Sequence, residues 1–352
     1  MRFGIFSNGL RGRALAADTY DADLEEIVAA DELGFEEAWV SEHFGGWLPD
    51  VVPAADLLIA KAAGLTRRIR LGPAVRLLPL SHPLDVATSA AMCDHLLRGR
   101  YLFGFGSGVP FVGNMERRGM SNDLRHPMVL EAIEFVLKCW TSPEPFDWDG
   151  RFWRGTGITM TPRCYQQPYP PIAVASGQPD LIRMAAERGW TVLISQFDPP
   201  EAIAARAAAY LAAAGGLAAD RSRLTVARHV HVGGTVRTAR QAVRADVNRA
   251  LDQWKRVNPE RFAGFLPAGG SLAGIDFDAA CASGLFIAGD PDTVFRQLRE
   301  VYNRSGGFGT LLLVMGKDWG TAAERTDSLR LFMSEVAPRL RAAAARQGAG
   351  AA

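Results

Sequence analysis

The chain has 352 residues, and the one best suited to chemistry is His43. It follows Glu42 and precedes two glycines and Trp47. An imidazole exchanges a proton near neutral pH, so His43 is a candidate general base. The glycines leave room for a flat ligand, and Trp47 offers it an aromatic face. The alternative is a hydrogen-bonded structural histidine beside a core tryptophan.

Two glycine-containing turns are candidates for binding an anion. Gly104-Phe105-Gly106-Ser107-Gly108 offers bare backbone whose N–H groups can point at an anion, although an ordinary tight turn has the same composition. Ser176, Gly177 and Gln178 stand directly before a predicted helix. Free N–H groups at a helix start, beside a hydroxyl side chain, form a phosphate site. Simple N-capping of the helix is the alternative.

Other histidines and the cysteines give weaker signals. His229 and His231 lie two apart on a predicted strand and so face the same side. No third ligand is evident, so a packed or hydrogen-bonded pair is favoured over a metal site. His82, before Pro83, is expected to be structural. Four widely spaced cysteines show no CxxC pattern, which argues against a disulfide framework or zinc site and favours a reducing cytoplasm.

Composition excludes several classes of protein. The chain has 39 Lys+Arg against 38 Asp+Glu, for a net charge of +1, which argues against nucleic-acid binding. No run of about 18 apolar residues offers a membrane span. Polar residues and glycines near the start, Gly4, Ser7 and Asn8, also argue against a secretory signal. A cytoplasmic protein that binds neither nucleic acid nor membrane is expected.

Eight short apolar runs alternate with helical patterns along the chain. The predicted strands are residues 1–6, 35–40, 69–75, 101–105, 172–175, 191–195, 224–232 and 310–315. Repeated βα alternation predicts parallel strands, and eight of them favour a (β/α)8 TIM barrel over a doubly wound sheet. The only glycine-rich candidate follows the fourth strand and lacks the GxGxxG spacing of a dinucleotide fold. In a barrel, function lies where strands end, and all three candidate segments follow strands.

The extra length is assigned to insertions in the βα loops. One TIM-barrel domain over residues 1–342 is expected, with insertions at about 141–171 and 258–284 and a frayed tail at 343–352. The first insertion is rich in proline and aromatic residues and is expected to carry short strands of its own. The second is expected to be irregular.

Five segments together resemble the bacterial luciferase-like flavin monooxygenases. They occur in order along the chain, at residues 34–47, 69–83, 95–108, 167–177 and 289–316, and include GFEEAWVSEHFGGW, IRLGPAVRLLPLSHP and QPYPPIAVASG. The Gly-Gly-Trp after His43 and the Arg125/Glu131 pair are most similar to the limonene monooxygenase branch. The resemblance implies a barrel that takes reduced FMN (FMNH2) from a separate NAD(P)H flavin reductase. The flavin would react with O2 to a C4a-peroxide that oxygenates a small apolar or carbonyl-containing substrate.

The resemblance also implies roles for particular residues. His43 matches the catalytic histidine, and the Ala74–Val75 bond matches a non-prolyl cis peptide under the flavin ring. Gly106 and Ser107 belong to the flavin-binding loop, and Ser176, Gly177 and Gln178 match the segment that binds the phosphate. A substrate pocket is expected from Trp47, Phe111 and Met115, with the loop 109–124 and the first insertion. No metal is implied.

Two positions depart from the family pattern. Ser107 stands where many relatives have an arginine that neutralises the phosphate, so flavin affinity falls unless Arg125 or another cation compensates. Gly106 replaces the reactive cysteine of the light-emitting members, so light production is not expected.

Alternatives stay open at this level. A deazaflavin (F420)-dependent oxidoreductase that transfers hydride has a similar Ser-Glu-His-Phe segment, and a non-catalytic flavin-binding protein would explain Ser107. Hydroxylation, epoxidation and Baeyer–Villiger insertion are equally compatible with the sequence. The sequence does not determine the oligomeric state; the resemblance makes a homodimer one candidate.

Overall fold

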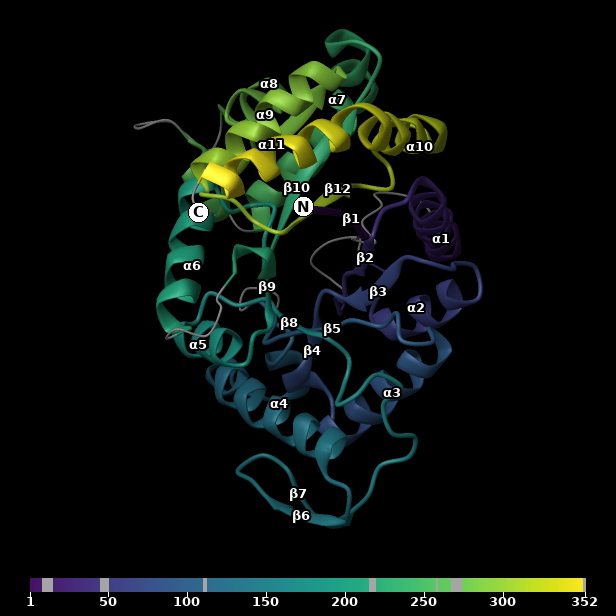
Figure 1. Cartoon of the computed structure of the whole chain (residues 1–352), viewed down its shortest axis with the longest axis vertical. Coiled ribbons are helices and arrows are strands. Elements are labelled where there is room, and N and C mark those ends of the chain that lie inside the picture. The colour runs from purple at the N-terminus through teal and green to yellow at the C-terminus, as the bar shows by residue number, and fades with distance from the viewer. Residues whose placement is uncertain are drawn as a thin grey trace.

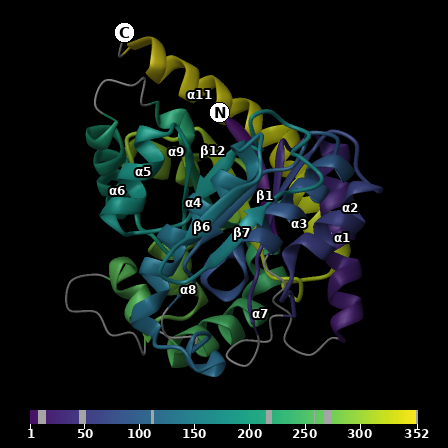
Figure 2. The same ribbon diagram turned by 90° about the horizontal axis from the view of Figure 1, so that it is seen from below.

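The protein forms a parallel sheet that curls around a central axis inside a ring of helices (Figure 1, Figure 2). The computed structural model describes residues 1–7, 15–44, 51–109, 113–214, 220–257, 259–266 and 274–350. The strands follow the order β3-β2-β1-β12-β10-β9-β8-β5-β4. Their bounds are β1 (Arg2–Ser7), β2 (Glu37–Val40), β3 (Arg70–Pro73), β4 (Arg76–Leu77), β5 (Phe103–Gly106), β8 (Ile172–Val174), β9 (Thr191–Ile194), β10 (Leu224–Val232) and β12 (Thr310–Met315).

The sheet closes because β3 and β4 are two halves of one strand. β3 pairs with β2, and β4 pairs with β5. Leu71 of β3 also bridges to Tyr101, and the backbone N–H of Leu102 donates to the Leu71 carbonyl at 2.8 Å. Within the described chain, the closed path contains eight strands when the halves count as one. The predicted (β/α)8 barrel and its eight strands are confirmed.

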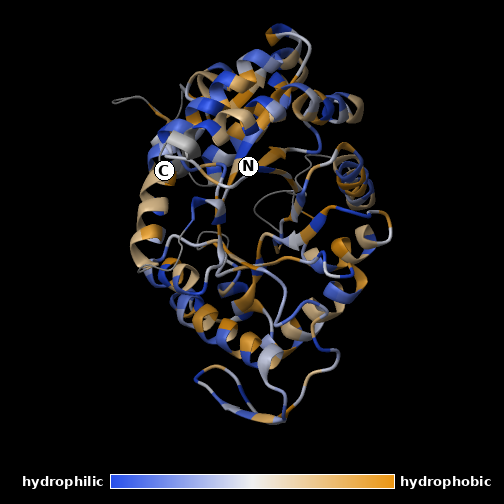
Figure 3. Ribbon diagram, viewed as in Figure 1, coloured by the Kyte–Doolittle hydropathy of each residue, from blue (hydrophilic) through white to orange (hydrophobic). Residues whose placement is uncertain are grey.

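The helices pack their apolar sides on the sheet and present polar residues outward (Figure 3). Their bounds are α1 (Ala16–Leu33), α2 (Ala55–Ala63), α3 (Pro83–Leu96), α4 (Arg125–Thr141), α5 (Pro179–Glu187), α6 (Pro200–Ala213), α7 (Val236–Val257), α8 (Phe277–Ala282), α9 (Pro291–Arg304), α10 (Ala322–Leu331) and α11 (Ala337–Gly350). Gly34 ends α1 with φ of 86°, a left-handed conformation that glycine adopts without steric cost.

The first insertion forms a hairpin outside the ring of helices (Figure 1). Strands β6 (Phe146–Asp149) and β7 (Arg154–Ile158) pair antiparallel, so the predicted short strands are confirmed. Glu131 of α4 holds the turn of this hairpin. Its carboxylate accepts the backbone N–H groups of Arg151 at 3.0 Å and Trp153 at 3.1 Å.

The second insertion contains more regular structure than its glycine and proline content suggests. It includes the short helix α8, and strand β11 (Phe286–Gly289) follows directly. β11 pairs in parallel with the second half of β10, from His229 to Val232. The expectation of an irregular segment was wrong here, and β11 was missed. Four residues between two glycines are too few to show a strand period.

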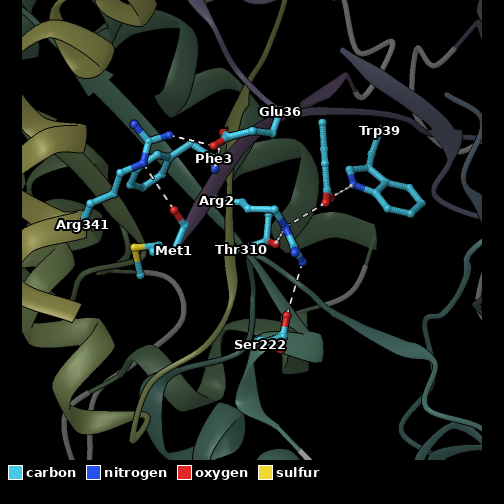
Figure 4. Close-up of polar contacts among 9 residues, drawn as sticks. Met1, Arg2, Phe3, Glu36, Trp39, Ser222, Thr310 and Arg341 are labelled. Atoms are coloured by element: carbon cyan, nitrogen blue, oxygen red, sulfur yellow. Dashed lines mark hydrogen bonds and ion pairs between the residues drawn. The ribbon is translucent and has the colours of Figure 1, made fainter. Parts of the chain in front are cut away.

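A polar network closes the end of the barrel where the strands begin (Figure 4). Arg2 pairs with Glu37 at 3.2 Å, and the Trp39 Nε1 donates to the Glu37 carboxylate at 2.9 Å. Arg341 of α11 pairs with Glu36 at 2.7 Å and thereby holds the last helix across this end (Figure 2). The predicted site residues that the structure describes follow the strands and lie at the opposite end.

A buried ionic cluster joins the segment directly after β12 to α1. Lys317 is fully buried, with its Nζ 3.3 Å from an Asp23 oxygen and 2.6 Å from a Glu26 oxygen. The Ser7 hydroxyl donates to Asp23. The amine neutralises carboxylates that burial would otherwise disfavour.

Candidate active site

The predicted cofactor residues meet where neighbouring strands end. The Ala74 N–H donates to the Val40 carbonyl at 2.7 Å, which places the break between β3 and β4 beside the end of β2. A Cβ on Gly106 would lie 2.8 Å from Val75 Cγ2 and 3.0 Å from the Ala175 oxygen. These strand ends are therefore in direct contact, and a side chain at position 106 would displace them.

The Ala74–Val75 peptide bond is cis, as the resemblance implies. Ala74 and Val75 pack against an apolar cluster inside the barrel. The partly buried members of that cluster are Phe6, Ala74, Val75 and Ala175. They form an apolar floor beneath the strand ends.

His43 lies three residues beyond the end of β2 and is half-buried. Its backbone N–H donates to the Val52 carbonyl at 2.9 Å. The preceding Glu42 accepts from Arg76 Nη1 at 2.7 Å and from the Leu77 N–H at 3.1 Å. Burial raises the pKa of Glu42, while Arg76 and the Leu77 N–H act in the opposite direction. Glu42 thus ties the histidine loop to the strand half that follows the cis peptide.

The loop after β5 reaches the histidine loop. The Arg118 guanidinium lies 4.5 Å from the centroid of the Phe44 ring, next to His43. Met115 in the same loop is only 2% exposed. Trp47 and Phe111, the other predicted pocket residues, lie outside the described residues. The contact with Phe44 is consistent with the expected role of this loop around the site.

The segment before α5 forms a tight turn, and an arginine of α6 donates a hydrogen bond to its backbone. The Ser176 Oγ accepts the Gln178 N–H at 3.0 Å, so this hydroxyl closes the turn. Arg206 of α6 donates from Nη1 to the Ser176 carbonyl at 2.7 Å. Its Nη2 lies 3.3 Å from an Asp198 oxygen. Reasoning from sequence missed Arg206, because it stands in an alanine-rich helix 30 residues away from Ser176.

The start of α4 brings a further cation to the same region. His126, in the first turn of α4, contacts Asp180 of α5 at 2.7 Å. The neighbouring Arg125 has its Nε and Nη1 buried without a hydrogen-bond partner among the described residues. Burial lowers the pKa of Arg125, and Glu116 opposes this effect. A half-buried guanidinium with two buried, unpaired nitrogens is suited to an anion. Ser107 offers no charge, and its Oγ contacts the Gly108 carbonyl at 3.4 Å.

His229 and His82 have structural roles. His229 is stacked between Trp254 and Phe286, with ring centroids 5.3 and 5.9 Å away, and its Nδ1 contacts the Leu285 carbonyl at 3.3 Å. Burial lowers the pKa of His229 to about 3 and that of His231 to about 4. His229 is therefore packed and hydrogen-bonded, as predicted, whereas His231 is buried (2% exposed) and its Nδ1 has no hydrogen-bond partner among the described residues. His82 Nδ1 accepts the Leu84 N–H at 3.2 Å and caps α3, as expected.

The described residues contain no group of three His, Cys, Asp or Glu side chains that could hold a metal ion. The four cysteines are buried and unpaired. None of the helices in the described ranges is long and apolar enough to cross a bilayer.

Comparison with known proteins agrees with this geometry. The sequence profile of the luciferase-like monooxygenase family matches residues 1–307. The 3,6-diketocamphane 1,6-monooxygenase of Pseudomonas putida is 28% identical over 96% of this chain and 97% of its own length. The limonene 1,2-monooxygenase of Rhodococcus erythropolis is 29% identical over 90% of this chain and 80% of its own length.

Solved structures show the same fold. The oxygenating constituent of 3,6-diketocamphane monooxygenase from Pseudomonas putida, a type II Baeyer–Villiger monooxygenase in complex with FMN, superimposes with a TM-score of 0.85. It is 27% identical and covers 96% of this chain and 98% of its own. An F420-dependent secondary alcohol dehydrogenase has a TM-score of 0.74 at 16% identity, with 97% and 99% covered, a likeness of fold alone.

Proposed function

This chain belongs to the luciferase-like monooxygenase family, and we propose that it is the oxygenase of a two-component system. In this proposal it takes reduced FMN from a separate NAD(P)H flavin reductase and adds one atom of O2 to a small apolar or carbonyl-containing substrate. The reduced flavin supplies two electrons and is oxidised, and the second oxygen atom leaves as water. The relative whose structure contains FMN is named as the oxygenating constituent of its enzyme. This name supports a separate reductase for the present chain. The bound flavin would supply the activation of O2 and the transfer of oxygen.

The residues present fit an FMN group. The close packing of Gly106 against Val75 and Ala175 carries the proposal, because it brings the ends of β5 and β8 together with the cis peptide at an apolar floor. A flat ring system can lie against such a surface. At one edge, the turn at Ser176–Gln178 and the unpaired Nε and Nη1 of Arg125 would hold the phosphate.

Each part of the site has a role in this proposal. Val75 and Ala175 exclude water beneath the ring, and excluding water protects reactive species from hydrolysis. His43 holds or moves a proton at its imidazole, and Glu42 fixes its loop relative to Arg76. The loop that carries Met115, with Trp47 and Phe111, would shape the substrate pocket.

The substrate class is inferred from the relatives. The diketocamphane and limonene enzymes are named for compact alicyclic compounds. We infer an alicyclic ketone or alkene as the substrate class, with Baeyer–Villiger insertion favoured for a ketone because the FMN-bound relative is of that type.

The test is turnover by the purified protein with a flavin reductase, NADH and O2. His43→Ala should abolish product formation and leave binding of reduced FMN within about twofold. His82→Asn is the matched control, because it replaces the capping histidine of α3 with another good cap. Unchanged turnover in His43→Ala removes the histidine from catalysis. Tight binding of F420 with no binding of reduced FMN favours hydride transfer and overturns the proposal.

We also propose a homodimer through the face formed by α2 and α3. These two helices carry three of the exposed large apolar side chains of the described residues: Leu57 (75%), Met92 (57%) and Leu96 (45%). A second copy would cover this face symmetrically, as closed homo-oligomers do. Leu57→Glu combined with Met92→Glu should halve the mass measured by light scattering. Leu15→Glu, at an equally exposed leucine directly before α1 (73%), should leave it unchanged; a monomeric wild type refutes the idea.

A further inference from the structure

We propose that Arg206 is the positioning residue of the FMN phosphate site. It holds the Ser176–Gly177 peptide so that the Gly177 N–H faces the phosphate, and it places behind this peptide a positive charge that Ser107 does not supply. The inference rests on the proposed function and assigns to a residue of α6 a role in selecting a phosphorylated flavin.

The contacts of Arg206 place it directly against the turn. Its Nη1 donates to the Ser176 carbonyl at 2.7 Å, and a Cβ on Gly177 would lie 3.3 Å from the same nitrogen. The Arg206 side chain is 29% exposed, so it is neither free in solvent nor sealed in the core. A charged donor makes a stronger hydrogen bond than a neutral one and polarises the peptide it contacts.

The geometry of a peptide bond then fixes the direction of the Gly177 N–H. The Ser176–Gly177 bond is trans, so its carbonyl and its N–H point in opposite directions. With Arg206 on the carbonyl, the Gly177 N–H points away from the guanidinium. On the far side of the turn, the Ser176 hydroxyl engages the Gln178 N–H. The orientation of this peptide therefore depends on Arg206.

Arg206 is itself fixed by the loop between β9 and α6. Its Nη2 lies 3.3 Å from an Asp198 carboxylate oxygen. The Asp198 carbonyl accepts from Arg228 Nη2 at 2.6 Å, and Arg228 is only 1% exposed. Arg228 also donates to the Ser195 carbonyl at 3.3 Å. This network joins β10, the loop and the turn at Ser176.

The proposal predicts opposite effects on phosphate binding for the two charges of this network. Removing the Arg206 charge should weaken binding of a phosphate. Asp198→Asn keeps an oxygen acceptor beside Arg206 and removes only the negative charge. It should strengthen binding, because the carboxylate offsets the guanidinium. If Arg206 only packed α6 against the turn, loss of either partner would loosen the turn and weaken binding.

The experiment compares reduced FMN with reduced riboflavin, which lacks the phosphate. Anaerobic titrations followed by tryptophan fluorescence give both dissociation constants. Arg206→Gln should weaken FMN binding by about 10- to 100-fold, the range for a hydrogen bond to a charged group, and leave riboflavin binding unchanged. Arg206→Lys should recover part of the loss, and Asp198→Asn should tighten FMN binding alone.

The matched control is Arg304→Gln, which removes an exposed guanidinium of α9 that pairs at 2.6 Å with Glu201 of α6, the helix that carries Arg206. It should leave both constants unchanged. An unaltered FMN-to-riboflavin ratio in Arg206→Gln overturns the inference while the proposed function stands. If Arg206→Gln does not fold, weaker FMN binding in Asp198→Asn overturns it. A wild type that binds neither flavin overturns the proposed function and this inference together.

Discussion

Acid should destabilise this protein through His229 and His231. In the folded state burial lowers their pKa values to about 3 and about 4, from an ordinary value of 6.5. Below pH 6.5 the unfolded chain binds protons that the folded chain does not, so the unfolded state is favoured. The stability due to these neutral histidines is fully present above pH 6.5 and is lost as the pH falls toward 4 and 3.

The size of the destabilisation follows from how many pH units the solution lies below 6.5. One pKa unit corresponds to about 1.36 kcal/mol, so two units below 6.5, at pH 4.5, each histidine costs roughly 2.7 kcal/mol. Together they cost roughly 5 kcal/mol, against a total stability of about 5–15 kcal/mol for a typical protein. The protein should therefore approach its unfolding threshold near pH 4.5.

Urea unfolding at pH 7.5, 6.5, 5.5 and 4.5 measures this loss. His229→Phe keeps a ring between Trp254 and Phe286 and removes one titrating group, so the loss between pH 7.5 and 4.5 should shrink by roughly 2.7 kcal/mol. Phe286→Leu is the control: it removes a stacked ring and should lower stability equally at each pH. If the loss in His229→Phe equals that of the wild type, the burial argument is refuted.

Three further substitutions test the fold around the site. Lys317→Met should lower the free energy of unfolding by about 3–5 kcal/mol, because two buried carboxylates of α1 lose their cation; adding Asp23→Asn and Glu26→Gln should restore much of it, and a loss below 1 kcal/mol would contradict this. Gly104→Ala should cost about 1–3 kcal/mol in thermal or urea unfolding, because its Cβ would lie 2.1 Å from the Pro73 oxygen; a neutral result would show that β3 and β5 separate easily. Glu131→Ala should speed hydrogen exchange in residues 146–158, by about 10- to 100-fold for a loss of about 1–3 kcal/mol, because the hairpin turn loses its acceptor; unchanged exchange would mean that other contacts hold the hairpin.

The sequence by itself determined the architecture. Strand and helix periods are local properties, so eight apolar runs separated by helical patterns predicted a closed parallel barrel before any contact was known. The structural role of His82 and the short strands of the first insertion were also predicted from neighbouring residues. The resemblance placed the cis peptide at Ala74–Val75, where the structure has it. The flavin-binding roles and the catalytic role of His43 that the resemblance implied remain predictions, although the strand ends that carry these residues do meet.

Only the tertiary structure decided which distant side chains share the site. Arg206 stands in an alanine-rich helix and carries no local signal, and it meets Ser176 because α6 lies beside α5. The unpaired nitrogens of Arg125 and the aromatic stack around His229 arise in the same way, from burial between elements. Strand β11 is recognisable only through its pairing with β10. Local patterns determine which elements form, whereas the charge and hydrogen bonding of the site depend on contacts that exist only after those elements pack.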